Sequence, residues 1–128
     1  MNTKLLSLGL LTGGTILLLQ GCASSPSGPA GLAGTWTNSM GTVWTMRSDG
    51  TFDVDLNKDG KRDAWGTCLV QDDTVTISGS GTAEIPNQCK GTKGVYHFKR
   101  TGNTLYFTLV SDPCKKRIEN VTQDWTKK

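Results

Sequence analysis

Short stretches in which apolar and polar side chains alternate dominate the chain from residue 34 onward. In residues 51–56, for example, every second side chain is apolar, beginning with Phe52. A period of two places these side chains on one face of a strand. Similar runs, rich in Val, Thr, Ile and aromatic residues, are separated by Gly, Asn and Asp turns. They predict strands at residues 35–38, 42–47, 51–56, 64–71, 74–78, 94–100, 104–110 and 118–126.

The predicted elements are about eight short strands with no convincing helix, which indicates an all-β domain. Most connections are short, so neighbouring strands should pair as a meander. An open meander of this length would leave two exposed edges, and closure into a barrel removes them. We therefore predict a small antiparallel up-and-down barrel, whose interior is just wide enough for side chains or one small ligand.

A different pattern precedes the strands. Lys4 is followed by an apolar, Leu-rich stretch at residues 5–19, which is typical of a secretory signal and shorter than the roughly 20 residues needed to cross a bilayer. Residues 23–33 are rich in Ser, Gly, Pro and Ala, as in a flexible tether. The expected organisation is a signal peptide at residues 1–21, a lipidated cysteine with its tether at residues 22–33, and a barrel domain at residues 34–128.

The residues Leu19-Gln20-Gly21-Cys22 resemble the lipobox of bacterial lipoproteins. The resemblance implies cleavage before Cys22 and lipid on its sulfur and new amino group, so that a membrane is the expected partner. A plain signal peptide cleaved elsewhere is the alternative. Ala23 stands where an Asp favours inner-membrane retention, which by analogy points to the outer membrane if the source is Gram-negative. The expected location is the cell envelope.

Charge and cysteines narrow the functional classes. Without Lys4, the 14 Lys and Arg residues become 13, and against 11 Asp and Glu the net charge is +2. No basic stripe is present, so we expect no nucleic-acid partner. Export makes a disulfide plausible. Cys89 and Cys114 both lie beside turn-forming residues, whereas Cys68 lies in a strand-like run; this favours a Cys89–Cys114 disulfide, although sequence alone does not prove the connectivity.

The stretch 53–63, DVDLNKDGKRD, is the strongest candidate for a metal site. Counted from the first predicted ligand, side-chain oxygens fall at positions 1, 3, 5 and 9, with Gly60 at position 6 for a sharp turn. Calcium takes six to eight oxygen ligands, and it would neutralise carboxylates that otherwise repel. The predicted ligands are Asp55, Asn57, Asp59 and Asp63 through their side chains and Lys61 through its backbone carbonyl.

This loop resembles the nine-residue calcium loops between strands of integrin-type propellers. It departs from an EF-hand because position 12 is Gly66 where Glu would be needed, and because its flanks are predicted strands. A solvated turn of Asp, Asn and Gly is the alternative. If calcium binds, its expected role is structural, because it would tie strand 51–56 to strand 64–71.

The opening Gly34-Thr35-Trp36 resembles the Gly-x-Trp start of lipocalins and related calycin barrels. In that family an Arg or Lys near the last strand packs across the Trp and closes the barrel base, which implies this role for Arg117 against Trp36. Residues 109–117 and Trp125 also look like the end of small bacterial lipocalin-like domains. The resemblance implies a lipocalin-like barrel over residues 34–125.

Catalytic chemistry has little support in the sequence. His97 is the only histidine, so a Ser-His-Asp arrangement would depend wholly on it, and the local alternation places it opposite Tyr96 and Phe98. We therefore expect no enzyme activity. The expected ligand is a small apolar molecule in the barrel, among Trp44, Phe52, Trp65, Phe98 and Phe107.

A protein-interaction role is the alternative, because membrane-bound lysozyme inhibitors are also small lipoproteins with β-barrels. Their Ser-Gly…Tyr segment is poorly matched, since Ser78 and Gly79 are followed by no Tyr at a suitable place.

Overall fold

The computed structural model describes residues 29–128. The expected signal peptide, the lipidation of Cys22 and residues 23–28 of the tether lie outside the described residues. The rest of the expected flexible tether is different from the prediction, because residues Pro29–Leu32 form a short helix and Leu32 is buried in the core of the barrel. Within residues 29–128, no helix is both long enough and apolar enough to span a membrane.

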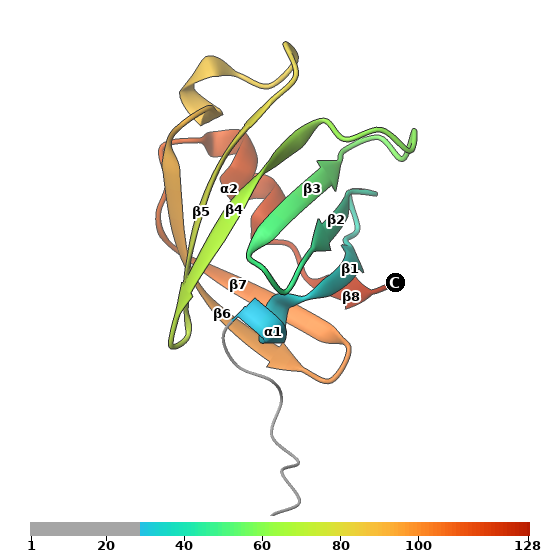
Figure 1. The fold of residues 1–128 in the computed structure, drawn as a ribbon, viewed down its shortest axis with the longest axis vertical. Helices are drawn as coiled ribbons and strands as arrows, with labels where there is room; N and C mark the ends of the chain where they lie inside the picture. The colour runs from blue at the N-terminus through green and yellow to red at the C-terminus, as the bar shows by residue number, and fades with distance from the viewer. Residues whose placement is uncertain (1–28) are drawn as a thin grey trace, which may run out of the picture.

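Eight antiparallel strands close into a barrel in sequence order, as the alternation predicts (Figure 1). The prediction of an all-β up-and-down barrel is thereby confirmed. The strands are β1 (Gly34–Thr37), β2 (Val43–Met46), β3 (Thr51–Asp55), β4 (Ala64–Gln71), β5 (Thr74–Gly81), β6 (Lys93–Thr101), β7 (Thr104–Ser111) and β8 (Trp125–Lys127). The remaining elements are α1 (Pro29–Leu32), the short 3-10 helix η1 (Asn87–Cys89) and α2 (Lys115–Val121).

The barrel closes through its shortest strand. β8 pairs with β1 at Trp36 opposite Lys127 and at Thr37 opposite Thr126, and it pairs with β7 over two further positions. By contrast, β4 and β5 form a long ribbon that is paired over eight positions. The closing strand therefore has few hydrogen bonds of its own and depends on buried side chains such as Trp125, which is 1% exposed.

The predicted strand at residues 118–126 is wrong in its first half, because residues up to Val121 belong to α2. Cys114 caps this helix by accepting a hydrogen bond at its sulfur from the Arg117 amide, at 3.2 Å. Ile118, Val121 and Trp125 follow a spacing close to the helical period, and Val121 is buried. In a strand, the three-residue step from Ile118 to Val121 would place these two side chains on opposite faces.

The closed end of the barrel is filled around Trp36, which is fully buried. Its indole nitrogen donates to the carbonyl oxygen of Leu32 at 2.9 Å, so that α1 covers this end (Figure 1). The cations over its ring are Arg100 and Lys127, at 5.3 and 5.8 Å from the ring centroid.

Arg117 is not the cation at Trp36, which corrects the role implied by the lipocalin resemblance. It belongs to α2, at the opposite end of the barrel from α1 (Figure 1). There it binds the Asp112 carboxylate. The helix that replaces the first half of the expected last strand moves this residue to the other end, so that strands β6 and β8 supply the cations at the base.

Candidate functional site

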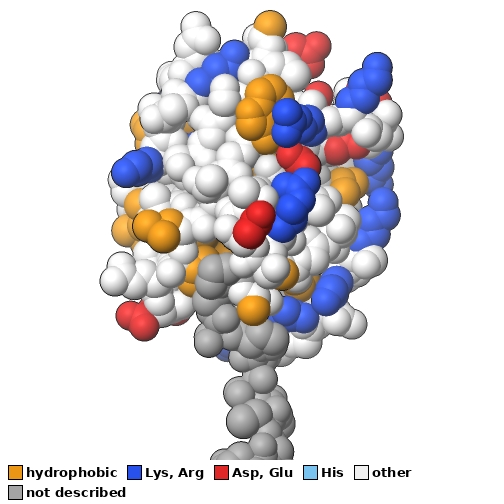
Figure 2. Space-filling view, viewed as in Figure 1, with side chains coloured by type: hydrophobic (Ala, Val, Ile, Leu, Met, Phe, Trp, Pro, Cys, Tyr) orange, Lys and Arg blue, Asp and Glu red, His pale blue; other side chains and the backbone are white. Residues whose placement is uncertain are grey.

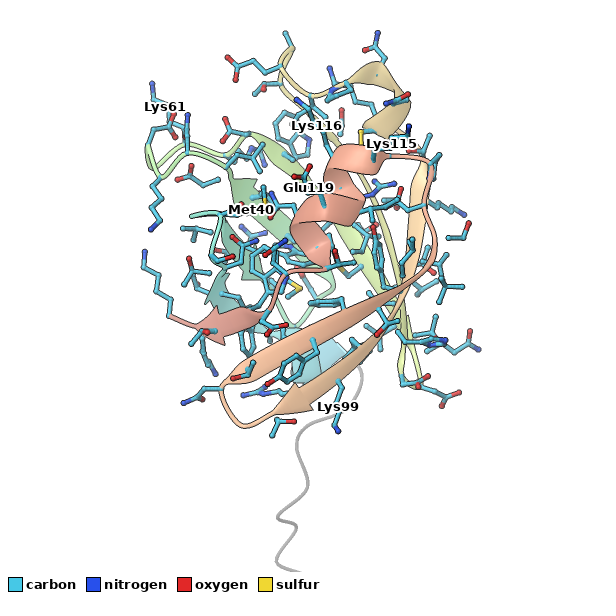
Figure 3. The ribbon with its side chains drawn as sticks, turned by 180° about the vertical axis from the view of Figure 1, so that it is seen from behind. Met40, Lys61, Lys99, Lys115, Lys116 and Glu119 are labelled. Atoms are coloured by element: carbon cyan, nitrogen blue, oxygen red, sulfur yellow. A yellow bond between two sulfur atoms is a disulfide. The ribbon has the colours of Figure 1, made fainter. Side chains whose placement is uncertain are left out.

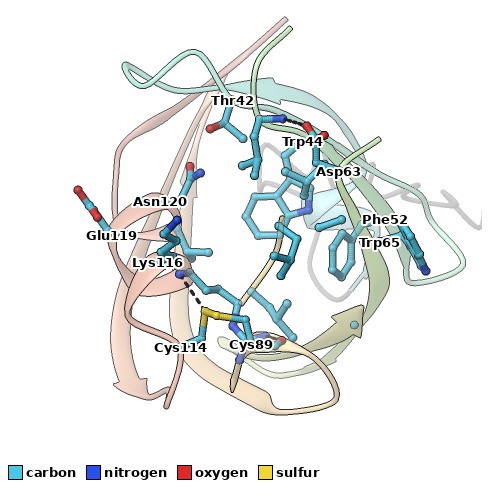
Figure 4. A pocket seen from close by; sticks show the side chains of 18 of the residues that line it. Thr42, Trp44, Phe52, Asp63, Trp65, Cys89, Cys114, Lys116, Glu119 and Asn120 are labelled. Carbon is cyan, nitrogen blue, oxygen red and sulfur yellow. Dashed lines mark hydrogen bonds between the residues drawn. A yellow bond between two sulfur atoms is a disulfide. The ribbon is translucent and has the colours of Figure 1, made fainter. Parts of the chain in front are cut away.

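A cavity of about 470 Å³ occupies the end of the barrel beneath α2 (Figure 4). Its lining is mainly apolar and comes from β2, β3, β5, α2 and the connection between β5 and β6. The principal apolar side chains are Trp44, Phe52, Val54, Ile77, Ile85 and Val121. We call this end of the barrel the mouth.

The strand β4 leaves room for the cavity because its inward positions near the mouth carry almost no side chain. Gly66 pairs with Phe52 on one side and with Gly79 on the other. A Cβ atom at Gly66 would lie 2.0 Å from the carbonyl oxygen of Ser78, and one at Gly79 would lie 2.1 Å from that of Trp65. The close approach of the two backbones requires glycine at both positions, so no side chain from this part of the wall fills the interior.

An aromatic cluster forms the floor of the cavity. The Trp44 ring centroid lies 5.0 Å from that of Trp125, 5.5 Å from that of Phe107 and 5.9 Å from that of Phe52. Phe98 packs beside Phe107 at 6.4 Å. Of the five aromatic residues expected around a ligand, Trp44 and Phe52 line the cavity, whereas Phe98 and Phe107 belong to the packing below it.

Trp65 differs from the expectation because it lies on the outer side of the wall, although it borders the cavity. It pairs across strands with Asp53, whose carboxylate binds Arg47 and Arg62. The Arg62 guanidinium carbon lies 4.3 Å from the Trp65 ring centroid, as in a cation–π contact.

A disulfide between Cys89 and Cys114 fastens the mouth, which confirms the predicted pairing (Figure 4). It joins η1 to the residue that caps α2, across 25 positions of sequence. Cys68 is free and buried. Burial raises the pKa of its thiol to about 12, so the sulfur stays protonated and is a poor nucleophile at neutral pH.

A buried charge network lies behind the disulfide. The Asp112 side chain is fully buried and accepts hydrogen bonds from Arg117 Nε and Nη2, both at 2.7 Å. Tyr96 donates its hydroxyl to the same carboxylate. Burial alone would raise the pKa of Asp112, but the hydrogen bonds from Arg117 and Tyr96 outweigh it and hold that pKa below its usual range. Sequence reasoning missed this network, because nothing local shows that Asp112 and Arg117 are buried with Tyr96.

The acidic loop between β3 and β4 brings three of its predicted ligands together. Asp55, Asp59 and Asp63 each offer a carboxylate oxygen, and these oxygens all lie within 4.8 Å of one another. Oxygens that share one calcium ion at about 2.3–2.6 Å can be at most about 5 Å apart. The carboxylate geometry therefore fits a calcium ion.

The backbone of the loop wraps around Asp55. Its carboxylate accepts the amides of Asn57 and Asp59 at 3.3 Å and that of Gly60 at 2.9 Å. Desolvation acts to raise the pKa of Asp55, but the hydrogen bonds from Gly60, Asn57 and Asp59 prevail and lower it. Gly60 adopts a positive φ of 81°, which allows the turn expected at that position.

Asp63 links the acidic loop to the mouth. It is 9% exposed, and its Oδ2 accepts the Leu56 amide at 2.7 Å. It also borders the cavity.

In the view of Figure 2, the Lys and Arg side chains gather mainly on the side of the acidic loop and β1, whereas the opposite side is mostly neutral.

His97 lies on the outer face of β6, as the alternation predicts. Its side chain is 54% exposed, with Nδ1 at 3.2 Å from Thr74 Oγ1 and 3.7 Å from an Asp73 carboxylate oxygen. Cys68, by contrast, is buried in the core cluster. The structure therefore does not assemble a Cys–His pair from these two residues.

The chain matches no protein-family model, and comparison with curated proteins and with solved structures finds no match either. The closed eight-stranded antiparallel barrel is consistent with a lipocalin-like fold.

Proposed function

We propose that this protein is a lipid-anchored lipoprotein of the cell envelope whose lipocalin-like barrel binds a small apolar ligand without catalysing a reaction. The observation that carries the proposal is the cavity of about 470 Å³ at the mouth. Its volume and its mainly apolar lining are those of small-molecule sites. Burial of an apolar ligand there would supply roughly 25 cal/mol for each Å² removed from water.

The polar groups near the cavity suit entry of a ligand from water. Lys116, Glu119 and Asn120 line it from α2, and Figure 3 shows Lys116 and Glu119 on this helix, with Met40 nearby. The apolar side chains Phe52 and Ile77 are almost fully buried. Such a division, with charge at the opening and apolar surface inside, favours an apolar ligand that enters from water.

A fluorescent apolar probe tests this function. The protein is produced with Cys22→Ser to keep it free of lipid and is titrated with N-phenylnaphthylamine. We expect saturable, blue-shifted fluorescence at one probe per chain. Val54→Trp places a large side chain in the cavity and should abolish the signal, whereas Val110→Trp adds the same indole at a position that is 50% exposed and should not. Equal binding by both variants, or no binding by the parent protein, would contradict the proposal.

We further propose that the acidic loop binds calcium in a structural role, through Asp55, Asn57, Asp59 and Asp63 and the Lys61 carbonyl. The spacing of the three carboxylates, within 4.8 Å, supports it. The loop joins β3 to β4 at the wall of the cavity, so an ion would hold this part of the mouth in place. The predicted ligands are all oxygen atoms, which suit calcium and give no indication of a redox-active metal.

Thermal melting in calcium and then in EDTA tests the metal site. Calcium at a hundredfold its dissociation constant should add about 2.7 kcal/mol to the free energy of unfolding. Each kcal/mol is worth roughly 4–8 °C in a domain of this size. Asp59→Ala should remove the shift, whereas Asp73→Ala, at an exposed turn outside the loop, should keep it. Identical melting temperatures in calcium and in EDTA would contradict the calcium site and show that the loop is a charged turn.

The alternative function, a lysozyme-inhibitor-type interaction module, has less support. Ser78 and Gly79 lie inside β5, paired with Thr67 and Gly66, and not in a protruding loop. An assay of lysozyme activity with the purified protein tests this alternative, and we expect no inhibition.

A further inference from the structure

The three buried tryptophans differ in what their indole N–H groups contact. Trp36 donates to the Leu32 carbonyl and Trp125 donates to the Val121 carbonyl, each at 2.9 Å. Trp44 is 2% exposed, yet its Nε1 has no hydrogen-bond partner among the described residues. Buried donors are nearly always paired in native proteins, because an unpaired one loses its hydrogen bond to water without replacement.

The unpaired indole borders the cavity. Trp44 is one of the lining residues, and Figure 4 shows its indole inside the barrel, next to Phe52. Two polar side chains of the lining already have other partners. Asp63 accepts the Leu56 amide at 2.7 Å, and Asn120 Oδ1 accepts from Asn38 at 2.6 Å. No group of the described residues accepts a hydrogen bond from Trp44 Nε1, so a bound molecule can supply the acceptor.

Charge limits the kind of acceptor. The Arg117 guanidinium, which also lines the cavity, is held by Asp112, and Lys116 projects from α2 at the opening. The aromatic floor around Trp44 offers no cation to a buried anion. A carboxylate placed there would lose its hydration without a counter-charge, whereas an uncharged oxygen would need only one donor.

We propose that the floor of the cavity is a subsite for an uncharged hydrogen-bond-accepting oxygen, with Trp44 Nε1 as its donor. The inference rests on the proposed function, since it assumes that an apolar ligand occupies the cavity. The ligand is then mainly hydrocarbon and carries a ketone, ester or amide carbonyl on its buried part. Phe52, Val54 and Ile77 contact the hydrocarbon, and Trp44 selects for the oxygen.

Phe52 provides the competing explanation for the unpaired indole. Its ring meets that of Trp44 edge to face, with centroids 5.9 Å apart and planes at 78°. An N–H group directed at a ring face makes a weak hydrogen bond. If that contact satisfied Trp44, the cavity would show no preference for a carbonyl over a hydrocarbon of the same shape.

A pair of matched ligands separates the two explanations. Methyl heptyl ketone and its methylene isostere, in which CH2 replaces the carbonyl oxygen, are titrated against the Cys22→Ser protein and against the same protein with Trp44→Phe. Each dissociation constant is measured by displacement of N-phenylnaphthylamine or by calorimetry. The ratio of the two dissociation constants within each protein cancels the effect of the substitution on general packing.

We expect the preference for the ketone to be about fivefold greater with Trp44 than with Phe, which is the factor for one net hydrogen bond of ordinary strength. Ile77→Val is the matched control, because it changes an apolar lining residue that takes no part in the contact between Trp44 and Phe52, and it should alter the affinity for both ligands by the same factor. A second readout does not depend on whether a Trp44 variant folds. In the Cys22→Ser protein, the NMR resonance of the Trp44 indole N–H should move downfield with the ketone and not with the isostere.

The outcomes distinguish this subsite from the function on which it rests. Binding of both ligands with no difference in preference and no downfield shift would overturn the Trp44 subsite and leave apolar ligand binding intact. Failure of both ligands and of the fluorescent probe to bind would overturn the subsite and the proposed function together.

Discussion

The two ends of the barrel are built on different principles. At the closed end, large side chains pack into the interior, and Trp36 and Leu105 have no exposed surface. At the mouth, about 470 Å³ remains unfilled. The Cys89–Cys114 disulfide and the ion pair between Asp112 and Arg117 hold that end together.

The difference shows how a small barrel can keep a cavity. Apolar packing stabilises the closed end, because every buried methylene group adds contacts and leaves water. The mouth has fewer such contacts, so directional bonds between elements far apart in sequence maintain its shape. Substitutions should therefore be costly at the two ends for different reasons.

Removal of core volume should be most costly at the closed end. Leu105→Ala removes a fully buried side chain and should lower the free energy of unfolding by about 2–5 kcal/mol. Val54→Ala, in the wall of the cavity, should cost about 1 kcal/mol, because its side chain is already next to open space. Denaturant unfolding of both variants measures the contrast, and equal losses would show that the two ends are packed alike.

Loss of the disulfide should loosen the mouth and spare the closed end. For a loop of 25 residues, the chain-entropy relation gives about 3.5 kcal/mol of lost stability. Hydrogen exchange of the variant with Cys89→Ser and Cys114→Ser should speed up in η1 and α2. In β1 and β7 near Trp36, exchange should speed up only as much as the loss of global stability requires. An equal additional increase throughout the barrel would contradict the separation of the two ends.

Asp112→Asn should cost about 3 kcal/mol, because it leaves the Arg117 charge without its counter-charge in a largely buried setting. Arg47→Ala provides the comparison, since it breaks the exposed pair with Asp53, for which about 1 kcal/mol or less is expected. Both values come from urea unfolding at neutral pH. Similar losses in the two variants would mean that the Asp112 pair stabilises no more than a surface contact.

The Asp112 carboxylate should also make the free energy of unfolding depend on pH. Because the pKa of Asp112 is lower in the folded state, its contribution is complete above the unfolded value of about 3.9. That contribution is lost as the pH falls through the folded value. The free energy of unfolding, measured from about pH 5 downward, should therefore decline more steeply in the parent protein than in Asp112→Asn. Parallel pH profiles of the two proteins would contradict this role of Asp112.

Local sequence was enough to predict the positions of β1 to β7 and the order of the strands. Alternation identified β3, and turn residues separated neighbouring strands; Asp72 and Gly102 have positive φ values of 56° and 59° in the hairpin turns. It was also enough to group the carboxylates of the acidic loop, because Asp55, Asp59 and Asp63 belong to one short loop and are only four residues apart. Calcium binding there remains a prediction.

Only the tertiary structure decided which face of a strand is the interior. In β4, apolar residues occur on both faces, and closure turned Cys68 inward and Trp65 outward. The helix α2 likewise formed where a strand was expected, and it placed Arg117 beside Asp112 at the mouth and not at Trp36. The alternation of a strand shows which residues share a face, but the direction of each face and the partner of each buried polar group depend on contacts between distant parts of the chain. The cavity and the unpaired Trp44 indole follow from those contacts.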